Sequence, residues 1–148
     1  MGDAQYDGEF VLTADGSKDF GEISPLVAKA IRRQAGKIRL RIGQQHNDAG
    51  DYGEKHIERP ERLAQLQGIG FDSARDFIAY TCNNFDEIYD NGKRLMLTKA
   101  DGGHTCVIEL KPLAGGEYYD VITGFISRRK SIESKVAKQK IKLLWQKP

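Results

Sequence analysis

The spacing of the apolar residues changes at the turn Asp90-Asn91-Gly92, and no other feature of the sequence constrains the fold as strongly. Upstream of this turn, apolar residues follow the spacing of amphipathic helices. The helices expected from this spacing span residues 25–35, 54–67 and 73–89. Ser24 and Ser73 stand at the starts of two of them, where serine is a favoured N-cap residue.

Downstream of the turn, apolar and polar residues alternate, which is typical of strands with two unlike faces. Glycine-rich turns at 101–103 and 114–116 separate the alternating stretches. The strands expected here span 94–99, 104–111, 117–126 and 141–145, and an earlier strand spans 37–42. Helices followed by a run of strands predict an α+β fold. We expect the N-terminal helices to pack on one face of a twisted antiparallel sheet of about four to five strands.

A chain of 148 residues is long enough for one domain with its own hydrophobic core. We expect that domain to span 22–148 and a flexible leader or linker remnant to span 1–21, where glycine and polar residues dominate. No apolar run reaches membrane-spanning length, so a membrane is not an expected partner. Cys82 and Cys106 lie in apolar surroundings and are expected to be buried free thiols, and the sequence leaves a disulfide open.

The net charge of +2 is too small for a polycation, so any binding of nucleic acid must depend on local clusters. One cluster is Lys37, Arg39 and Arg41, which alternate with apolar residues and give the strand over 37–42 a basic face. Further basic runs occupy 128–130 and 135–142. Each basic run taken alone fits an ordinary solvent-exposed surface as well as it fits a nucleic-acid site.

His56 is the first candidate for catalysis because it lies near the start of an expected helix, between Lys55 and Arg59. Nearby cations and a helix N-terminus favour the neutral imidazole, which suits a general base. The alternative is a surface or capping histidine. Hydroxyl and cationic side chains near the end of the strand over 117–126 are a second candidate site, for a phosphate. These side chains are Thr123, Ser127 and Arg128, and the neighbouring cations Lys99 and Arg129 extend the set.

The spacing of histidine and cysteine does not match a known metal motif. His104 and Glu109 face opposite sides of their expected strand, and His46 lies in a polar loop. The sequence therefore predicts neither a metal nor a cofactor. It also shows no carboxylate cluster for magnesium, which favours RNA over DNA as a substrate.

Several stretches of the chain together resemble a group of bacterial nuclease domains. They are Ser-Pro-Leu-Val-Ala-Lys-Ala-Ile, Gly-Lys-Ile-Arg-Leu-Arg-Ile-Gly, Tyr-Gly-Glu-Lys-His-Ile, Arg-Leu-Met-Leu-Thr-Lys, Tyr-Tyr-Asp-Val-Ile-Thr-Gly-Phe and Leu-Leu-Trp. The domains belong to the barnase, EndoU and colicin-type ribonuclease superfamily, often called the BECR fold. They occur in phage and mobile-element polyvalent proteins and as C-terminal toxin domains. The resemblance covers residues 22–146 and is one of pattern, without a single diagnostic motif.

The resemblance implies a sheet whose concave face binds RNA, and a cleavage that needs no metal. In that reaction the ribose 2′-OH attacks its own phosphate and leaves a 2′,3′-cyclic phosphate. Carried over, His56 becomes the acid or base, Thr123, Ser127 and Arg128 hold the phosphate, and Lys99 adds a cation. Related sequences favour a second histidine where this chain has Arg59-Pro60, so the second acid or base is unassigned. Arg59 would instead stabilise the charged transition state.

Together with this resemblance, the sequence predicts a metal-independent endoribonuclease, with tRNA as one candidate substrate. Its RNA-binding side chains would be Lys37, Arg39, Arg41, Lys99 and Arg129. The resemblance implies an acidic immunity or antitoxin protein as partner. It also implies action in the bacterial cytoplasm after delivery as the C-terminal part of a larger secreted or phage-borne protein. The alternative is a non-catalytic module on the same scaffold that binds nucleic acid or another protein.

Overall fold

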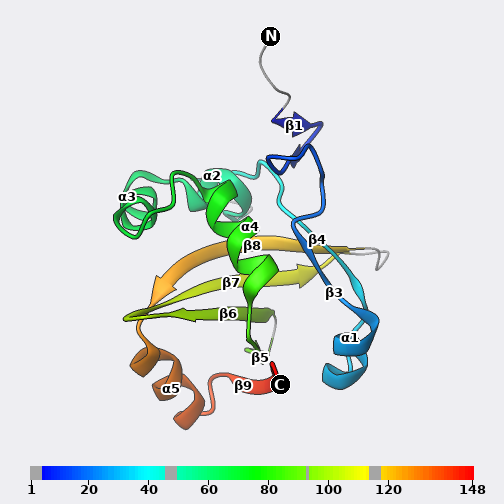
Figure 1. Ribbon diagram of the computed structural model, residues 1–148, viewed down its shortest axis with the longest axis vertical. Helices are drawn as coiled ribbons and strands as arrows, with labels where there is room; N and C mark the ends of the chain where they lie inside the picture. Colours follow the sequence, from blue (N-terminus) through cyan, green and yellow to red (C-terminus); the bar gives the residue numbers. More distant parts are fainter. Residues whose placement is uncertain (1–4, 46–49, 93, 114–117) are drawn as a thin grey trace.

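The computed structural model describes residues 5–45, 50–92, 94–113 and 118–148 (Figure 1). The turn expected at 114–116 and His46 lie outside these residues. The strands are β1 (Tyr6–Asp7), β2 (Phe10–Val11), β3 (Gly21–Ile23), β4 (Gly36–Arg39), β5 (Glu87–Asp90), β6 (Leu95–Asp101), β7 (His104–Pro112), β8 (Tyr118–Ser127) and β9 (Lys142–Gln146). The helices are α1 (Pro25–Ile31), α2 (Gly53–Ile57), α3 (Pro60–Gly68), α4 (Ala74–Asn84) and α5 (Arg129–Ala137).

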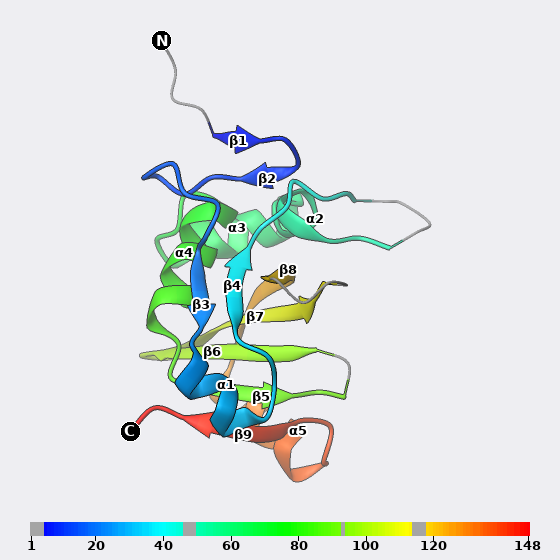
Figure 2. The same cartoon turned by 90° about the vertical axis from the view of Figure 1, so that its right-hand side faces the viewer.

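A sheet of seven strands in the order β3-β4-β8-β7-β6-β5-β9 forms the centre of the protein. All of its neighbouring strands are antiparallel except β4 and β8, which pair in parallel with Ile38 opposite Tyr119. The sheet is strongly curled: β3 and β4 run across the direction of β5, β6 and β9 (Figure 2). Helix α1 contacts β9, so the curl brings the two ends of the sheet toward each other.

Helix α4 covers one face of the sheet, where it contacts β6 and β7 (Figure 1). Its buried residues Phe77 and Ile78 belong to the main core cluster, together with Ile38, Ile108 and Val121 from the sheet. The opposite face has a smaller cluster, which Ile132 of α5 covers. Burial of apolar side chains on both faces is the main source of stability for such a sheet.

The expected arrangement of N-terminal helices on an antiparallel sheet of four to five strands is wrong. The fold is a mixed α/β fold, in which the sheet has seven strands and contains the parallel β4–β8 pair. The helices are also spread along the chain, since α5 follows β8. The two additional strands β3 and β5 could not be predicted from the sequence. They have three and four residues, which are too few to show a clear alternation of apolar and polar residues.

Two of the expected helices have different bounds for local physical reasons. The helix expected over 54–67 is divided into α2 and α3, and Pro60 is the first residue of α3. The helix expected over 73–89 ends at Asn84, and Ile88 and Tyr89 lie in β5 instead. The positions of Ile88 and Tyr89 in the apolar pattern fit both the end of a helix and a short strand. The predicted N-caps are confirmed, because Ser24 and Ser73 accept hydrogen bonds from Val27 N and Asp76 N.

The N-terminal stretch expected to be a leader contains core residues in its second half. Val11, Leu12 and Phe20 are buried, and Val11 and Phe20 donate backbone hydrogen bonds of 2.8 Å to the carbonyls of Leu40 and Ile38. Residues 10–23 therefore pack against the domain.

Cys82 and Cys106 are buried and free, as predicted. None of the helices in the described part of the chain has the length and apolar character that a bilayer crossing requires.

A buried ion pair secures the junction beside the parallel strands. Asp120 of β8 is fully buried, and its Oδ2 accepts hydrogen bonds of 2.6 Å and 3.1 Å from Nη2 and Nε of Arg41. Its Oδ1 has no hydrogen-bond partner among the described residues. Burial raises the pKa of Asp120 even though Arg41 opposes this shift. The carboxylate thus depends on Arg41 for its charge compensation.

Replacing Arg41 by Met should strongly destabilise the protein, because it leaves a buried carboxylate without its cation. We expect a loss of about 3–5 kcal/mol in the free energy of unfolding, measured by urea denaturation. The Asp120→Asn change added to Arg41→Met should recover part of this loss, because it removes the unpaired charge.

Lys37→Met is the matched control. Lys37 pairs with Glu22, and both side chains are about half exposed, so its loss should cost less than about 1 kcal/mol. Equal losses for Arg41→Met and Lys37→Met would show that the buried pair has no special weight.

Candidate functional site

His56 lies on the short helix α2, which a close backbone crossing holds against the end of β4. Gly43 and Gly53 make the crossing, both with positive φ. A Cβ atom on Gly53 would lie 2.5 Å from the carbonyl oxygen of Arg41, and one on Gly43 would lie 1.8 Å from that of Tyr52. The first amides of the helix, Glu54 N and Lys55 N, donate to the carbonyls of Arg41 and Ile42, each at 2.9 Å. These backbone contacts therefore fix the position of α2 and of the backbone of His56.

The hydrogen bond between His56 and Gln45 defines the roles of the two ring nitrogens. His56 Nδ1 lies 2.8 Å from Gln45 Oε1, and an amide oxygen can only accept. Nδ1 therefore carries the proton in the neutral ring, and Nε2 keeps its lone pair. An imidazole with its lone pair on Nε2 can accept a proton from a substrate.

Arg59 lies against the same imidazole. Its Nη1 is 3.4 Å from each ring nitrogen and donates a 2.7 Å hydrogen bond to the carbonyl oxygen of His56. Partial burial lowers the pKa of His56 most, and the positive charge of Arg59 lowers it further. Arg62 and Arg94 lower it by smaller amounts, whereas the negative charge of Asp51 raises it. His56 lies in the last turn of α2, so these cations, and not a helix N-terminus, favour its neutral form.

Cations and an aromatic ring from β8 and its neighbours extend this site. Arg62 of α3 donates a hydrogen bond to the carbonyl oxygen of Gly124, and its guanidinium lies 5.6 Å from the centre of the Phe125 ring. Lys135 of α5 approaches the same ring at 5.8 Å. Helix α2 also contacts β8, and the charge of Arg62 acts on His56, so these two residues lie beside the same strand.

Thr123 is the predicted hydroxyl residue that lies in this stretch of β8. It is opposite Glu109 of β7, and Arg94 forms a 3.3 Å ion pair with the Glu109 carboxylate. Arg94 influences the pKa of His56, so this pair lies within electrostatic range of the imidazole. We call His56, Arg59, Arg62, Arg94, Thr123 and Phe125 the β8 site.

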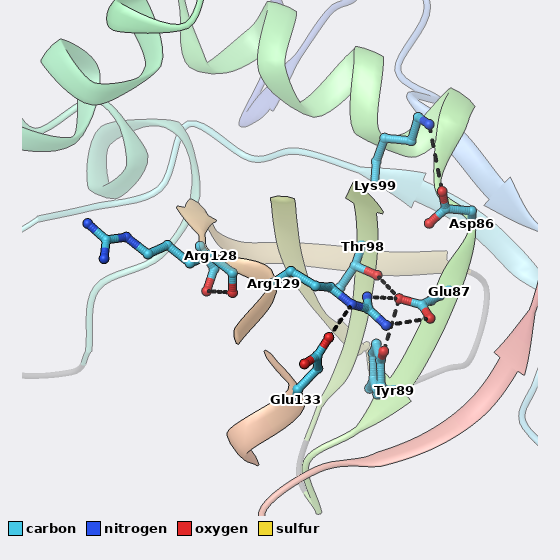
Figure 3. A network of polar contacts seen from close by, with 9 residues as sticks. Asp86, Glu87, Tyr89, Thr98, Lys99, Arg128, Arg129 and Glu133 are labelled. Atoms are coloured by element: carbon cyan, nitrogen blue, oxygen red, sulfur yellow. Dashed lines mark hydrogen bonds and ion pairs between the residues drawn. The ribbon is translucent and has the colours of Figure 1, made fainter. Parts of the chain in front are cut away.

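Ser127 is the last residue of β8, about 13 Å along the strand from Thr123 at 3.3 Å per residue, and Arg128 follows it as the N-cap residue of α5. Ser127 is opposite Thr105, and its hydroxyl donates to the carbonyl of Arg128 at 3.4 Å. Arg128 points away from the network around Glu87 (Figure 3). The structure therefore does not place these two residues beside Thr123.

The cations predicted to bind RNA all form ion pairs with carboxylates. Lys37 pairs with Glu22, Arg39 with Asp19, Arg41 with Asp120, Lys99 with Asp86 and Arg129 with Glu87. Arg39 is also held between the rings of Phe10 and Tyr118. Each of these cations thus has a partner within the protein, whether or not it also contacts RNA.

Arg129 is part of a buried polar network on the face of the sheet that α5 covers (Figure 3). Its Nη1 lies 2.5 Å from Glu87 Oε1, and Glu87 is only 6% exposed. Tyr89 and Thr98 also donate hydroxyl hydrogen bonds to Glu87, at 2.9 Å and 3.3 Å. Burial acts to raise the pKa of Glu87, but these hydrogen bonds outweigh it and lower the pKa. Arg129 therefore fastens the start of α5 to β5.

Sequence reasoning missed Gln45, Arg62 and Arg94. Arg62 follows Arg59 by three residues, a spacing that can bring side chains together on a helix, and this signal was available. Arg94 directly follows the turn at 90–92 but carries no pattern of its own. Gln45 lies in a polar loop, where nothing in the sequence indicates that it meets His56.

Comparisons with protein-family models, with curated proteins and with solved structures each returned no match. The likeness to the ribonuclease superfamily therefore stays a prediction.

A separate open hollow of about 540 Å³ lies beside β3 and α4, away from His56. Its charged lining is mainly acidic, from Asp15, Asp19 and Glu22, with Lys37 as the cation, so it suits an anionic ligand poorly.

The backbone crossing can be tested with Gly53→Ala. We expect it to lose about 1–3 kcal/mol more stability than Gly16→Ala, because its new Cβ would clash with the Arg41 carbonyl. Gly16 is the matched control: it also has positive φ, but a Cβ there meets nothing within 4 Å. Chemical denaturation of both variants measures the difference, and equal losses would mean that the crossing tolerates a side chain.

The state of His56 can be tested by NMR titration of the imidazole nitrogens. We expect the Nδ1–H tautomer in the neutral ring and a pKa below the ordinary value of about 6.5. Arg59→Met should raise this pKa, because it removes a nearby positive charge. Lys55→Met, an exposed neighbour, should change it less. A pKa unaltered by Arg59→Met would remove Arg59 as a cause of the shift.

Proposed function

We propose that the protein is a metal-independent endoribonuclease in which His56 is the general base. The observation that carries this proposal is the arrangement of the imidazole. Gln45 holds Nδ1 at 2.8 Å, Arg59 lies against the ring, and the pKa is lowered. A histidine that is neutral at neutral pH, with its lone pair on Nε2, can remove a proton from a ribose hydroxyl that takes the place of Arg59 Nη1 beside Nε2.

In the proposed reaction, Nε2 of His56 takes the proton of the 2′-OH as its oxygen attacks the adjacent phosphorus. The new bond joins the 2′-oxygen to phosphorus, and the bond from phosphorus to the 5′-oxygen breaks. The products are a 2′,3′-cyclic phosphate and a 5′-hydroxyl, whose oxygen takes its proton from solvent water because no second acid residue is assigned. The phosphoryl oxygens gain negative charge on the way, and Arg59 and Arg62 supply the opposing charge.

Arg59 and Arg62 can serve in this way because they are not already committed to carboxylates. Among the described residues, no carboxylate lies within 4.0 Å of either guanidinium, unlike the five cations of the ion pairs above. Their polar contacts are to the carbonyl oxygens of His56 and Gly124 and to the imidazole ring. Phe125, whose ring centre lies 5.6 Å from the Arg62 guanidinium and 5.8 Å from Lys135 Nζ, offers an aromatic ring for a base.

The partner and the setting follow from the same proposal. A cationic site of this kind would be blocked by an acidic immunity or antitoxin protein. The site of action would be the bacterial cytoplasm, and tRNA is one candidate substrate.

The proposal is tested by incubating the purified protein with total bacterial RNA in EDTA and mapping the ends of the fragments. We expect discrete fragments with cyclic-phosphate ends. His56→Ala should reduce cleavage by at least about 100-fold, the contribution of a general base. Lys55→Ala, the adjacent change, should retain cleavage.

Full cleavage by His56→Ala would contradict the role of this residue. Salt-sensitive binding of RNA without any cleavage would identify a binding module instead. Absence of both would favour a domain that binds an acidic protein.

The pH dependence gives a second test. A general base works only when deprotonated, so kcat/KM should fall as the pH drops through the pKa of His56. Since that pKa is lowered, the acidic limb should lie below pH ~6.5. Arg59→Met should move the limb to higher pH in addition to slowing cleavage. A limb that does not follow the His56 pKa measured by NMR in the wild-type protein and in Arg59→Met would contradict His56 as the titrating base.

A further inference from the structure

We propose that Asp101, His104 and Cys106 bind a transition-metal ion of the Zn²⁺ type at the tip of the β6–β7 hairpin. One ligand atom from each residue lies within 4.8 Å of the other two. This set is separate from the β8 site, and neither the sequence patterns nor the proposed function assigns it a role.

The hairpin brings the three side chains to one face of the sheet. Asp101 and His104 are opposite each other across the turn, where Gly102 takes a positive φ that suits glycine. His104 and Cys106 are two residues apart on β7, so their side chains point the same way. Cys106 belongs to the core cluster beneath α4, which identifies this face as the one that α4 covers.

The three ligand types fit one class of metal. A thiolate, an imidazole and a carboxylate together suit Zn²⁺ or Co²⁺ in tetrahedral geometry, whereas Mg²⁺ and Ca²⁺ prefer oxygen ligands alone. Bond lengths of about 2.0–2.3 Å to a shared ion place tetrahedral ligands somewhat under 4 Å apart. The observed separations therefore need only small side-chain movements. The fourth position would be open to water or to another ligand.

The surroundings provide a second layer of support. The Tyr80 hydroxyl on α4 donates a 2.6 Å hydrogen bond to Asp101 Oδ2, which orients the carboxylate and leaves Oδ1 available. Lys99, opposite Cys106, is paired with Asp86 at 3.6 Å, so its charge is partly compensated. Burial raises the pKa of the Cys106 thiol to about 11, so a metal would bind by displacing that proton. His104 and Asp101 are only partly buried and give an ion access.

The metal would have a structural role, because its three ligands lie at the tip of the β6–β7 hairpin and none of them belongs to the β8 site. A bound ion would tie the hairpin tip together beneath α4. RNA cleavage in EDTA tests the β8 site independently, so the two proposals can fail separately.

The test uses the purified, metal-free protein titrated with Co²⁺. Thiolate coordination in a tetrahedral site gives a near-ultraviolet charge-transfer band and intense visible bands. We expect both bands at one equivalent of Co²⁺, and their loss when Zn²⁺ displaces it. Zn²⁺ should also raise the thermal unfolding temperature.

Substitutions of the proposed ligands distinguish a specific metal site from incidental metal binding. Cys106→Ser should abolish the charge-transfer band, whereas Cys82→Ser, which changes the other buried cysteine, should retain it. Asp101→Asn and His104→Gln should weaken Co²⁺ binding at least tenfold and keep the result interpretable if Cys106→Ser fails to fold. Tyr80→Phe should weaken it by roughly 10–100-fold. A wild-type protein without the thiolate band, or a band that persists in Cys106→Ser, would overturn the proposal.

Discussion

The buried carboxylate of Asp120 is the constraint on which the rest of the structure depends. It lies in β8 beside the parallel pairing with β4, and Arg41 supplies its charge compensation. Arg41 follows directly after β4 and leads to the crossing of Gly43 and Gly53, from which α2 begins. The position of His56 therefore depends on a buried charge that lies six elements later in the chain, in β8. Since one carboxylate oxygen has no partner among the described residues, this junction has little tolerance for change.

The cations named above as candidates for binding RNA or phosphate include two groups with different partners. Lys37, Arg39, Arg41, Lys99 and Arg129 pair with carboxylates and hold elements together. Arg59 and Arg62 bind backbone carbonyl oxygens and remain available to an anion. A basic residue in a strand pattern thus says little about RNA binding until its neighbours are known, because the ion pair and the RNA contact draw on the same charge.

The two faces of the sheet carry different groups. One face carries the main core cluster beneath α4, with residues of α2 and α3, and the proposed metal ligands lie at its edge. The opposite face carries the Glu87 network beneath α5. Phe125 packs on this second face, and its ring meets Arg62 of α3, so the β8 site draws on elements from both sides of the sheet.

The sequence by itself determined the local features of this protein. It predicted the helix starts at Ser24 and Ser73, the hairpin at Asp101-Gly102-Gly103, the free buried cysteines and His56 as a candidate beside Arg59. These depend on neighbours within a few residues, where propensity and spacing act. Only the tertiary structure decided the seven-stranded sheet, the parallel β4–β8 pair and the contacts of Gln45 with His56 and of Arg62 with Gly124. Such contacts join segments whose pairing is selected by burial and charge compensation across the whole fold, which no local pattern records.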